Sequence, residues 1–136
     1  MNSLAQDFCS HLVGVSSLAL VLGTNLFRGK VDTDNVDGAV VAVKDTPGDD
    51  PEHGFEFDRP RCQVYVRGAK GSYANAYAIA QAVRKELMTL TANGATTING
   101  TRYNGVYAVG DVNYITYDEE NRPIFTANFR VHRSTA

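Results

Sequence analysis

One segment, Tyr73 to Leu90, constrains the fold of this chain more than any other. Its apolar residues recur every three or four positions, which is the spacing of one face of an α-helix. Ser72 precedes the segment as a candidate N-cap, and Asn93-Gly94 follows it as a candidate stop. We therefore expect a long amphipathic helix that lies on β-strands, with an apolar face made by Tyr73, Ala76, Tyr77, Ala80, Val83, Leu87 and Leu90.

A second amphipathic helix is predicted over residues 3–15, ending near Gly14 and Ser16. The residues that recur at helical spacing are Leu4, Phe8, His11, Leu12 and Val15. Since each helix has one apolar face to bury, we expect both to share one face of a sheet.

The remaining segments have the patterns of strands. Residues 39–43 form a continuous apolar run that is rich in valine, which is typical of a central strand covered on both faces. Residues 62–67 alternate between apolar and polar, and residues 25–29 are a short strand candidate. Asn99-Gly100 is a strong signal for a type I′ turn. The other expected strands are 96–98 and 101–103 around this turn, then 105–116 and 124–132, joined by a polar loop over 118–123.

These elements predict an α+β fold: two helices packed on a mixed, largely antiparallel sheet, with a long acidic loop. The chain has 136 residues, 43% of them hydrophobic and 21% charged, so we expect a single domain over residues 1–136 with a real core. We expect no membrane-spanning segment and no secretion signal, because the longest apolar stretch, residues 12–22, is short and interrupted.

The acidic loop is expected over residues 45–60, which hold three of the four prolines. Residues 31–60 have a net charge of −7, while the rest of the chain has +5. Opposite charges on two parts of one small protein favour association with other copies or partners, although solvated loops would also explain them. Phe55 and Phe57 either meet a partner or anchor the loop to its own domain. The candidate contact residues of this loop are Asp49, Asp50, Glu52, Phe55, Phe57 and Arg59.

Arginine outnumbers lysine by nine to four, and its planar guanidinium suits bidentate pairing with carboxylates at interfaces. Arg28, Arg67 and Arg130 lie on or beside expected strands and are further interface candidates. Each is equally compatible with an ordinary surface ion pair.

No group of residues predicts catalysis, a metal or a cofactor. Asp32, Asp34 and Asp37 resemble a calcium loop, but Val43 stands where the closing glutamate should be. His53 lies among acids in the flexible-looking loop, which does not preorganise a metal or acid–base site. Cys9 and Cys62 lack metal-ligand spacing and are expected to be reduced, partly buried thiols.

Several segments together resemble the tail terminator (tail completion, often labelled minor capsid) proteins of long-tailed bacteriophages. The resemblance covers nearly the whole chain and departs from the family pattern at residues 30–38, where aspartates replace an expected Pro-Asp type turn. The segments that carry it are 25–29, 41–48, 62–68 running into the 73–90 helix, 97–103, 105–108 and 118–131.

The resemblance implies a structural virion protein with no enzymatic activity, assembled in the bacterial host cytoplasm. Such proteins form a hexameric ring on the last ring of the tail tube, at its head-proximal end. The ring ends tube polymerisation and joins the tail to the neck, so the implied partners are further copies, the tail tube protein and a neck or head-completion protein. DNA would only pass through the lumen, and no membrane is involved.

Other functions remain open at this stage: a small adaptor or head-completion protein of the connector, a small enzyme, or a DNA-binding domain. An enzyme would need a convergent polar pocket. A DNA-binding domain would have duplex affinity that falls steeply with salt.

Overall fold

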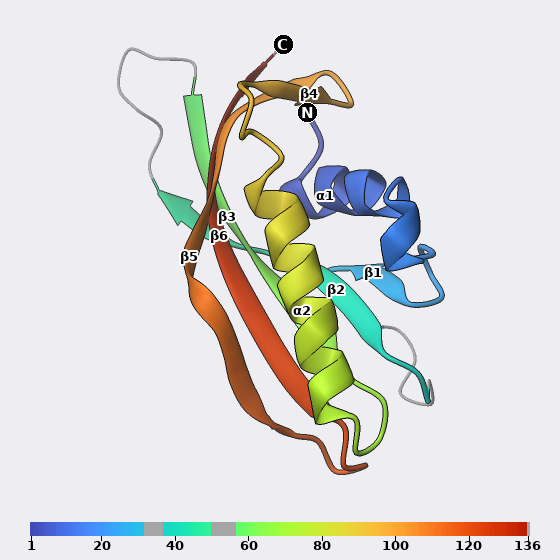
Figure 1. The fold of residues 1–136 in the computed structure, drawn as a ribbon. Helices are drawn as coiled ribbons and strands as arrows, with labels where there is room; N and C mark the ends of the chain where they lie inside the picture. Colours follow the sequence, from blue (N-terminus) through green and yellow to red (C-terminus); the bar gives the residue numbers. More distant parts are fainter. Residues whose placement is uncertain (32–36, 50–56, 136) are drawn as a thin grey trace.

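The computed structural model describes residues 1–31, 37–49 and 57–135, and Figure 1 traces their course. Two α-helices and six strands are present in these residues. In chain order the elements are α1 (Leu4–Val13), a 3₁₀ turn (Ser16–Leu18), β1 (Leu26–Arg28), β2 (Val40–Asp49), β3 (Phe57–Arg67), α2 (Tyr73–Met88), β4 (Thr96–Ile98), β5 (Thr101–Tyr117) and β6 (Pro123–Thr135).

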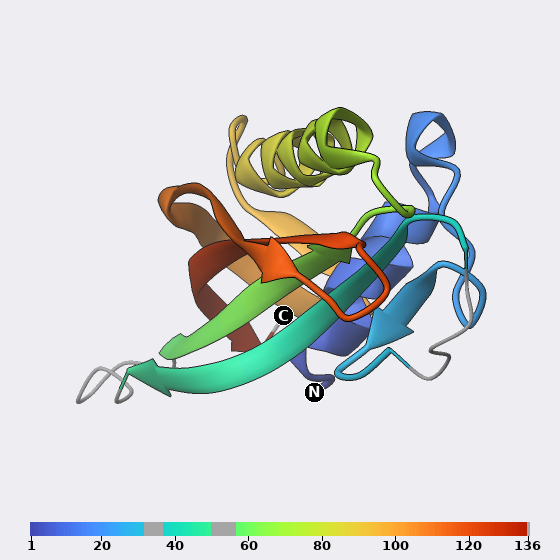
Figure 2. The same ribbon diagram turned by 90° about the horizontal axis from the view of Figure 1, so that it is seen from below.

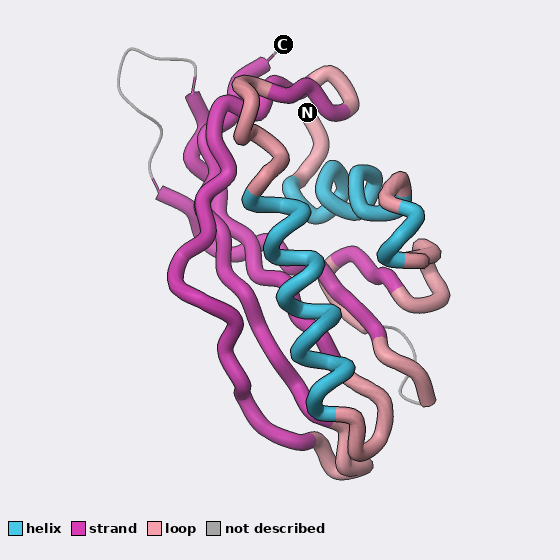
Figure 3. The backbone as a smooth tube through the Cα atoms, viewed as in Figure 1, coloured by secondary structure: helices cyan, strands magenta, loops and turns pink. Residues whose placement is uncertain are grey.

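The strands form one mixed sheet in the order β1-β2-β3-β6-β5-β4 (Figure 3). Only β1 and β2 are parallel, and the other neighbours are antiparallel. The prediction of a mixed, largely antiparallel sheet is therefore confirmed. Residues 40–43 of β2 are buried on both faces, as their apolar run predicts.

Both helices lie on the same face of the sheet, as expected (Figures 1 and 2). Because side chains alternate along a strand, every second residue points toward the helices. The core between the layers is built mainly from Leu4, Phe8, Leu12, Val41, Val43, Val64, Val66, Ala76, Ala80, Val83, Leu87, Phe125, Ala127, Phe129 and Val131.

The predicted stripe of α2 is correct along its centre and wrong at its start. Ala76, Ala80 and Leu87 are buried against the sheet, but Tyr73 and Tyr77 are exposed. At the start of the helix, both phenol rings are partly exposed and contact the buried Phe125 in a T-shaped arrangement.

Helix α2 also ends at Met88 rather than Leu90. The Thr89 hydroxyl donates to the carbonyl oxygen of Lys85 at 2.9 Å, and such a side-chain bond competes with the next backbone bond of the helix. Ser72 occupies the N-cap position, as predicted, but its side chain makes no capping hydrogen bond.

Helix α1 begins with a capping box at Ser3. The Gln6 N–H donates to the Ser3 hydroxyl at 3.2 Å, and the Ser3 N–H donates to the Gln6 side chain at 2.8 Å.

Helix α1 is linked to the β4–β5 side of the sheet by the buried carboxylate of Asp7. This carboxylate accepts hydrogen bonds from the Tyr103 hydroxyl and, at 3.0 Å, from the Asn99 amide. Burial and the bond to Asp7 raise the pKa of Tyr103.

Strands β2 and β3 are longer than the sequence predicts, so residues 45–49 and 57–60 are not loop. Asp49 pairs with Arg59 after a register shift that follows Thr46. β1 covers only residues 41–43 of β2, which leaves Pro47 on an edge where its missing N–H costs no ladder bond. Gly48 comes so close to β3 that a Cβ there would lie 2.6 Å from the Arg59 carbonyl oxygen. The acidic residues 50–56 lie outside the described residues.

The Asn99-Gly100 turn is confirmed. Both residues have positive φ, 49° and 80°, as a type I′ turn requires. The predicted strands 101–103 and 105–116 form one strand, β5, which continues through Asn104. Its pairing with β6 accommodates irregularities after Tyr103 and Val109.

The packing of α2 gives a direct stability prediction. Leu87→Ala should lower the free energy of unfolding by about 2 to 5 kcal/mol, since it removes a fully buried side chain and leaves a cavity. Met88→Ala, at the exposed neighbouring position, is the control and should change stability by less than about 1 kcal/mol. Urea unfolding followed by circular dichroism measures both, and equal effects would contradict the packing described.

Candidate interaction surface

The sheet face opposite the helices is the candidate interaction surface. No helix covers it within residues 1–31, 37–49 and 57–135 (Figure 2). Strand alternation brings polar, basic and aromatic side chains to this open face, because the residues between the core positions point away from the helices. They include Lys44, Arg61, Gln63, Tyr65, Arg67, Tyr107, Thr126, Asn128 and Arg130.

Cross-strand contacts organise the open face. The Gln63 amide donates to the Asn128 side-chain oxygen at 3.2 Å. The Lys44 Nζ lies 4.5 Å from the centre of the Tyr65 ring, and the Arg130 guanidinium lies 5.4 Å from that of Tyr107. These cations over aromatic rings give the face a basic and aromatic character, which suits carboxylate-bearing or polar protein partners.

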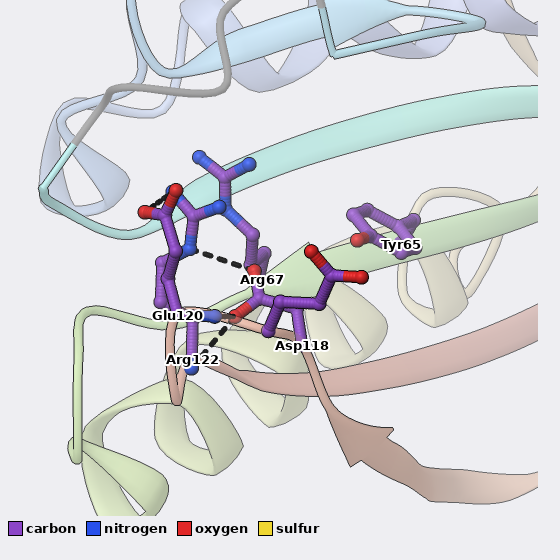
Figure 4. A pocket seen from close by; sticks show the side chains of 6 residues that line it. Tyr65, Arg67, Asp118, Glu120 and Arg122 are labelled. Atoms are coloured by element: carbon purple, nitrogen blue, oxygen red, sulfur yellow. Dashed lines mark hydrogen bonds and ion pairs between the residues drawn. The ribbon is translucent and has the colours of Figure 1, made fainter.

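A charged cluster of Asp118, Glu120 and Arg122 lies at the turn between β5 and β6, at one end of the open face (Figure 4). The Arg122 Nε donates to Asp118 Oδ2 at 2.7 Å. Asp118 Oδ1 also accepts from the backbone N–H of Arg122 at 2.9 Å and of Glu120 at 3.0 Å. Desolvation acts to raise the pKa of Asp118, but these donors outweigh it and hold the pKa below its usual value.

The cluster borders an open hollow of about 390 Å³ lined by Tyr65, Arg67, Asp118, Glu119, Glu120 and Arg122. Burial raises the pKa of Tyr65, so its hydroxyl stays protonated at neutral pH. Both charge signs meet in this hollow, and Asp118 and Arg122 are engaged with each other. The arrangement suits docking of a polar segment rather than proton transfer to a substrate.

Three of the predicted contact residues of the acidic loop, Asp49, Phe57 and Arg59, lie in the described ends of β2 and β3. Asp49 and Arg59 are register partners, and Phe57 begins β3 opposite Ser134. Asp50, Glu52 and Phe55 lie outside the described residues, as do His53, Asp32 and Asp34.

The three predicted interface arginines lie in three places. Arg28 is exposed at the end of β1, Arg67 is buried beside the charged cluster, and Arg130 is exposed on the open face. They do not form one site. The sequence reasoning missed Arg122 and Tyr65, although the alternation over residues 62–67 already places Tyr65 on the polar face.

Other titratable groups serve the fold. His11 Nε2 lies 2.9 Å from Glu86 Oε1 and links the two helices. Burial raises the pKa of Cys9 to about 11 and also raises that of Cys62, so both thiols stay protonated at neutral pH. In the described part of the chain, no three histidine, cysteine or acidic side chains gather closely enough to hold a metal ion. Neither described helix has the length and apolarity that crossing a bilayer requires.

Comparison with known proteins gives a family match and several similar solved structures. A family model described as "Bacteriophage tail terminator protein" matches residues 15–135. Among solved structures, a chain from the virion of a native gene transfer agent (GTA) particle superposes with a TM-score of 0.68 at 16% sequence identity, over 97% of this chain and 95% of that chain. At this identity the superposition supports the fold alone. A search of curated proteins gave no match.

The Asp118 cluster predicts a pH-dependent contribution to stability. Asp118→Asn should lower the free energy of unfolding at pH 7 by about 1 to 2 kcal/mol, because charge-assisted bonds to Arg122 are lost. The folded-state pKa lies below the unfolded value of about 3.9. The contribution is therefore complete above that value and is lost as the pH falls through the lowered folded pKa.

The measurement is urea unfolding at several pH values and low protein concentration, with exposed Glu119→Gln as the control. The gap between the wild type and Asp118→Asn should close in acid, while the control stays near the wild type throughout. A gap that persists at the lowest pH would contradict the assignment.

Proposed function

Because the chain belongs to the bacteriophage tail terminator family, we propose that it forms a hexameric ring at the head-proximal end of a phage tail tube. The ring ends tube polymerisation and presents the surface to which the neck of the filled head attaches. The observation that carries this proposal is the family match, which leaves only the first 14 residues and the last one unmatched. Family membership makes the chain a structural virion protein, and the role needs surfaces rather than a catalytic centre.

The distribution of charge supports ring closure. A ring of identical copies uses a heterologous contact, in which one patch meets a different patch on the next copy. Residues 31–60 have a net charge of −7 and the remainder +5, and opposite charges on the two patches favour such a contact. In this proposal the acidic residues Asp49, Asp50 and Glu52, with Phe55, Phe57 and Arg59, contact a neighbouring copy or the tube. Of the three candidate arginines, the exposed Arg28 and Arg130 supply basic contacts, and the buried Arg67 lies beside the charged cluster.

The proposal has further parts. Residues 1–136 act as one tail terminator domain, the ring assembles in the host cytoplasm, and it ends up at the head-proximal end of the tail. Its partners are the tail tube protein and a neck or head-completion protein, and DNA passes through the lumen.

Native mass spectrometry and a tube assembly assay test the function. The purified protein should have the mass of six chains, and adding it to polymerising tube protein should stop growth at one end of each tube. The control is an equal amount of Leu87→Ala protein, whose core is weakened; it tests whether the effect on tube growth depends on the folded chain. A ring that binds neck protein but leaves tube growth unchanged would contradict the terminator role and favour a connector adaptor.

The acidic segment is tested by neutralising charge at constant chain length. The triple variant Asp49→Asn, Asp50→Asn, Glu52→Gln should weaken ring or tube association about tenfold or more, because three opposite-charge contacts are lost. The matched control is Asp32→Asn, Asp34→Asn, Asp37→Asn, which changes net charge equally elsewhere in the acidic stretch. Equal effects of the two variants would mean that net charge, and not this segment, matters.

A further inference from the structure

Four exposed tyrosines lie close together near the start of α2, three of them around one buried phenylalanine. Tyr73, Tyr77 and Tyr114 lie with their ring centres 5.0, 5.7 and 5.9 Å from that of Phe125, and Tyr117 lies 6.1 Å from Tyr114. Tyr73 is 45% exposed, Tyr77 40%, Tyr114 48% and Tyr117 38%. We call these four residues the tyrosine patch.

The tyrosine patch has the composition of an interface centre rather than of ordinary surface. Tyrosine offers a large, rigid contact area at a low cost in conformational entropy and is enriched among residues that dominate binding energy. The rings are held in place by edge-on contacts with Phe125 and with each other, so little ordering is needed on binding.

The strand beneath the patch is not suited to pairing with a strand of a partner. Beyond Tyr103, β5 has a described strand partner on one side only, which is β6. Its register shifts between Val109 and Asn113, and the Arg84 guanidinium donates to the Gly110 carbonyl oxygen at 2.9 Å on this stretch. A bulge and a charged side chain are devices that block edge-to-edge pairing. A partner must therefore contact the tyrosine side chains rather than extend the sheet.

A complementary hollow lies beside the opposite edge of the sheet. It has a volume of about 310 Å³ and lies between α1 and β1, lined by Gln6, Cys9, Ser10, Val13, Leu22 and Arg28. Val13 and Leu22 are 46% and 44% exposed, and Val21, next to Leu22, is also exposed. We call it the α1–β1 hollow.

The chemistry of the two surfaces matches. Apolar walls accept phenol rings, and an arginine guanidinium such as that of Arg28 stacks on aromatic faces. The exposed charges also differ in sign. Asp111, Glu119 and Glu120 are exposed and close to Tyr114 and Tyr117 in the chain; Asp111 lies 3.9 Å from Arg84 and Glu120 3.6 Å from Arg122, so Glu119 adds the negative charge that these arginines do not balance. Arg28 and Lys30 are exposed beside the hollow.

We propose that the tyrosine patch of one copy docks in the α1–β1 hollow of the next copy, an inference that rests on the proposed ring. Strands β5 and β1 lie toward opposite edges of the sheet, so one chain cannot satisfy its own contact (Figure 1). The contact is head-to-tail, and its repetition around an axis closes a ring.

Two surface variants test this contact. Tyr114→Ser with Tyr117→Ser removes the outer part of the patch, and Leu22→Asp places a charge in the hollow. Each should weaken self-association about a hundredfold, so that native mass spectrometry at micromolar concentration finds monomers. Met88→Ser, at an exposed position outside both surfaces, is the control and should keep the mass of the wild type. Circular dichroism and thermal melting check folding. If the double serine variant melts early, Tyr117→Lys alone replaces it.

Mixing the two variants gives the sharper result. The patch variant keeps its hollow and the hollow variant keeps its patch, so an equimolar mixture should form one-to-one heterodimers and nothing larger. If the Leu22→Asp protein still self-associates, the patch contacts a surface other than the hollow. If the double serine variant still forms rings but no longer ends tubes, the patch contacts the tube. Either result overturns this inference and leaves the proposed ring standing. A wild-type protein that stays monomeric overturns the proposed ring, and this inference with it.

Discussion

Burial of one face of the sheet under two helices is the constraint on which the rest of the structure depends. The apolar residues of β2, β3 and β6 need cover, and α1 and α2 together supply it over the central strands. The buried carboxylate of Asp7 then joins α1 to Tyr103 of β5 and to the Asn99 turn, across the full width of the layer. Because a buried carboxylate must be hydrogen-bonded to be tolerated, this junction fixes how the first helix lies on the sheet.

What the helices leave uncovered determines the available surfaces. The open face has cations over aromatic rings, the β5–β6 turn has a compact charge cluster, and the start of α2 carries the tyrosine patch. A chain with this distribution has contacts to offer in several directions. A ring that sits between a tube and a neck requires contacts of that kind, with neighbouring copies on two sides and different partners above and below.

Much of the fold could be predicted from local pattern. The 3.6-residue period of α2, the valine run of β2 and the Asn99-Gly100 turn each specify their own conformation, and all three elements are present, although the buried stripe of α2 does not include Tyr73 and Tyr77. The extent of β2 and β3 could not be predicted in this way. Pro47, Gly48 and Pro60 are typical of loops, yet they lie in strands. Pro47 is accommodated at an edge position, and Gly48 lies where β2 comes close to Arg59. Pro60 falls at a gap in the pairing of β3 with both β2 and β6. These are properties of neighbouring strands, which a local pattern does not contain.

The candidate surfaces divide in the same manner. The sequence by itself determined the residue types, the unequal distribution of charge and the absence of a recognisable catalytic motif, because these depend only on which residues are present and how they are spaced. Only the tertiary structure decided that Tyr73 meets Tyr114 at the surface, that Arg122 binds Asp118, and that Arg28, Arg67 and Arg130 lie apart. The physical reason is that each of these outcomes depends on sheet order and register, which are set by packing between segments that are far apart in the chain.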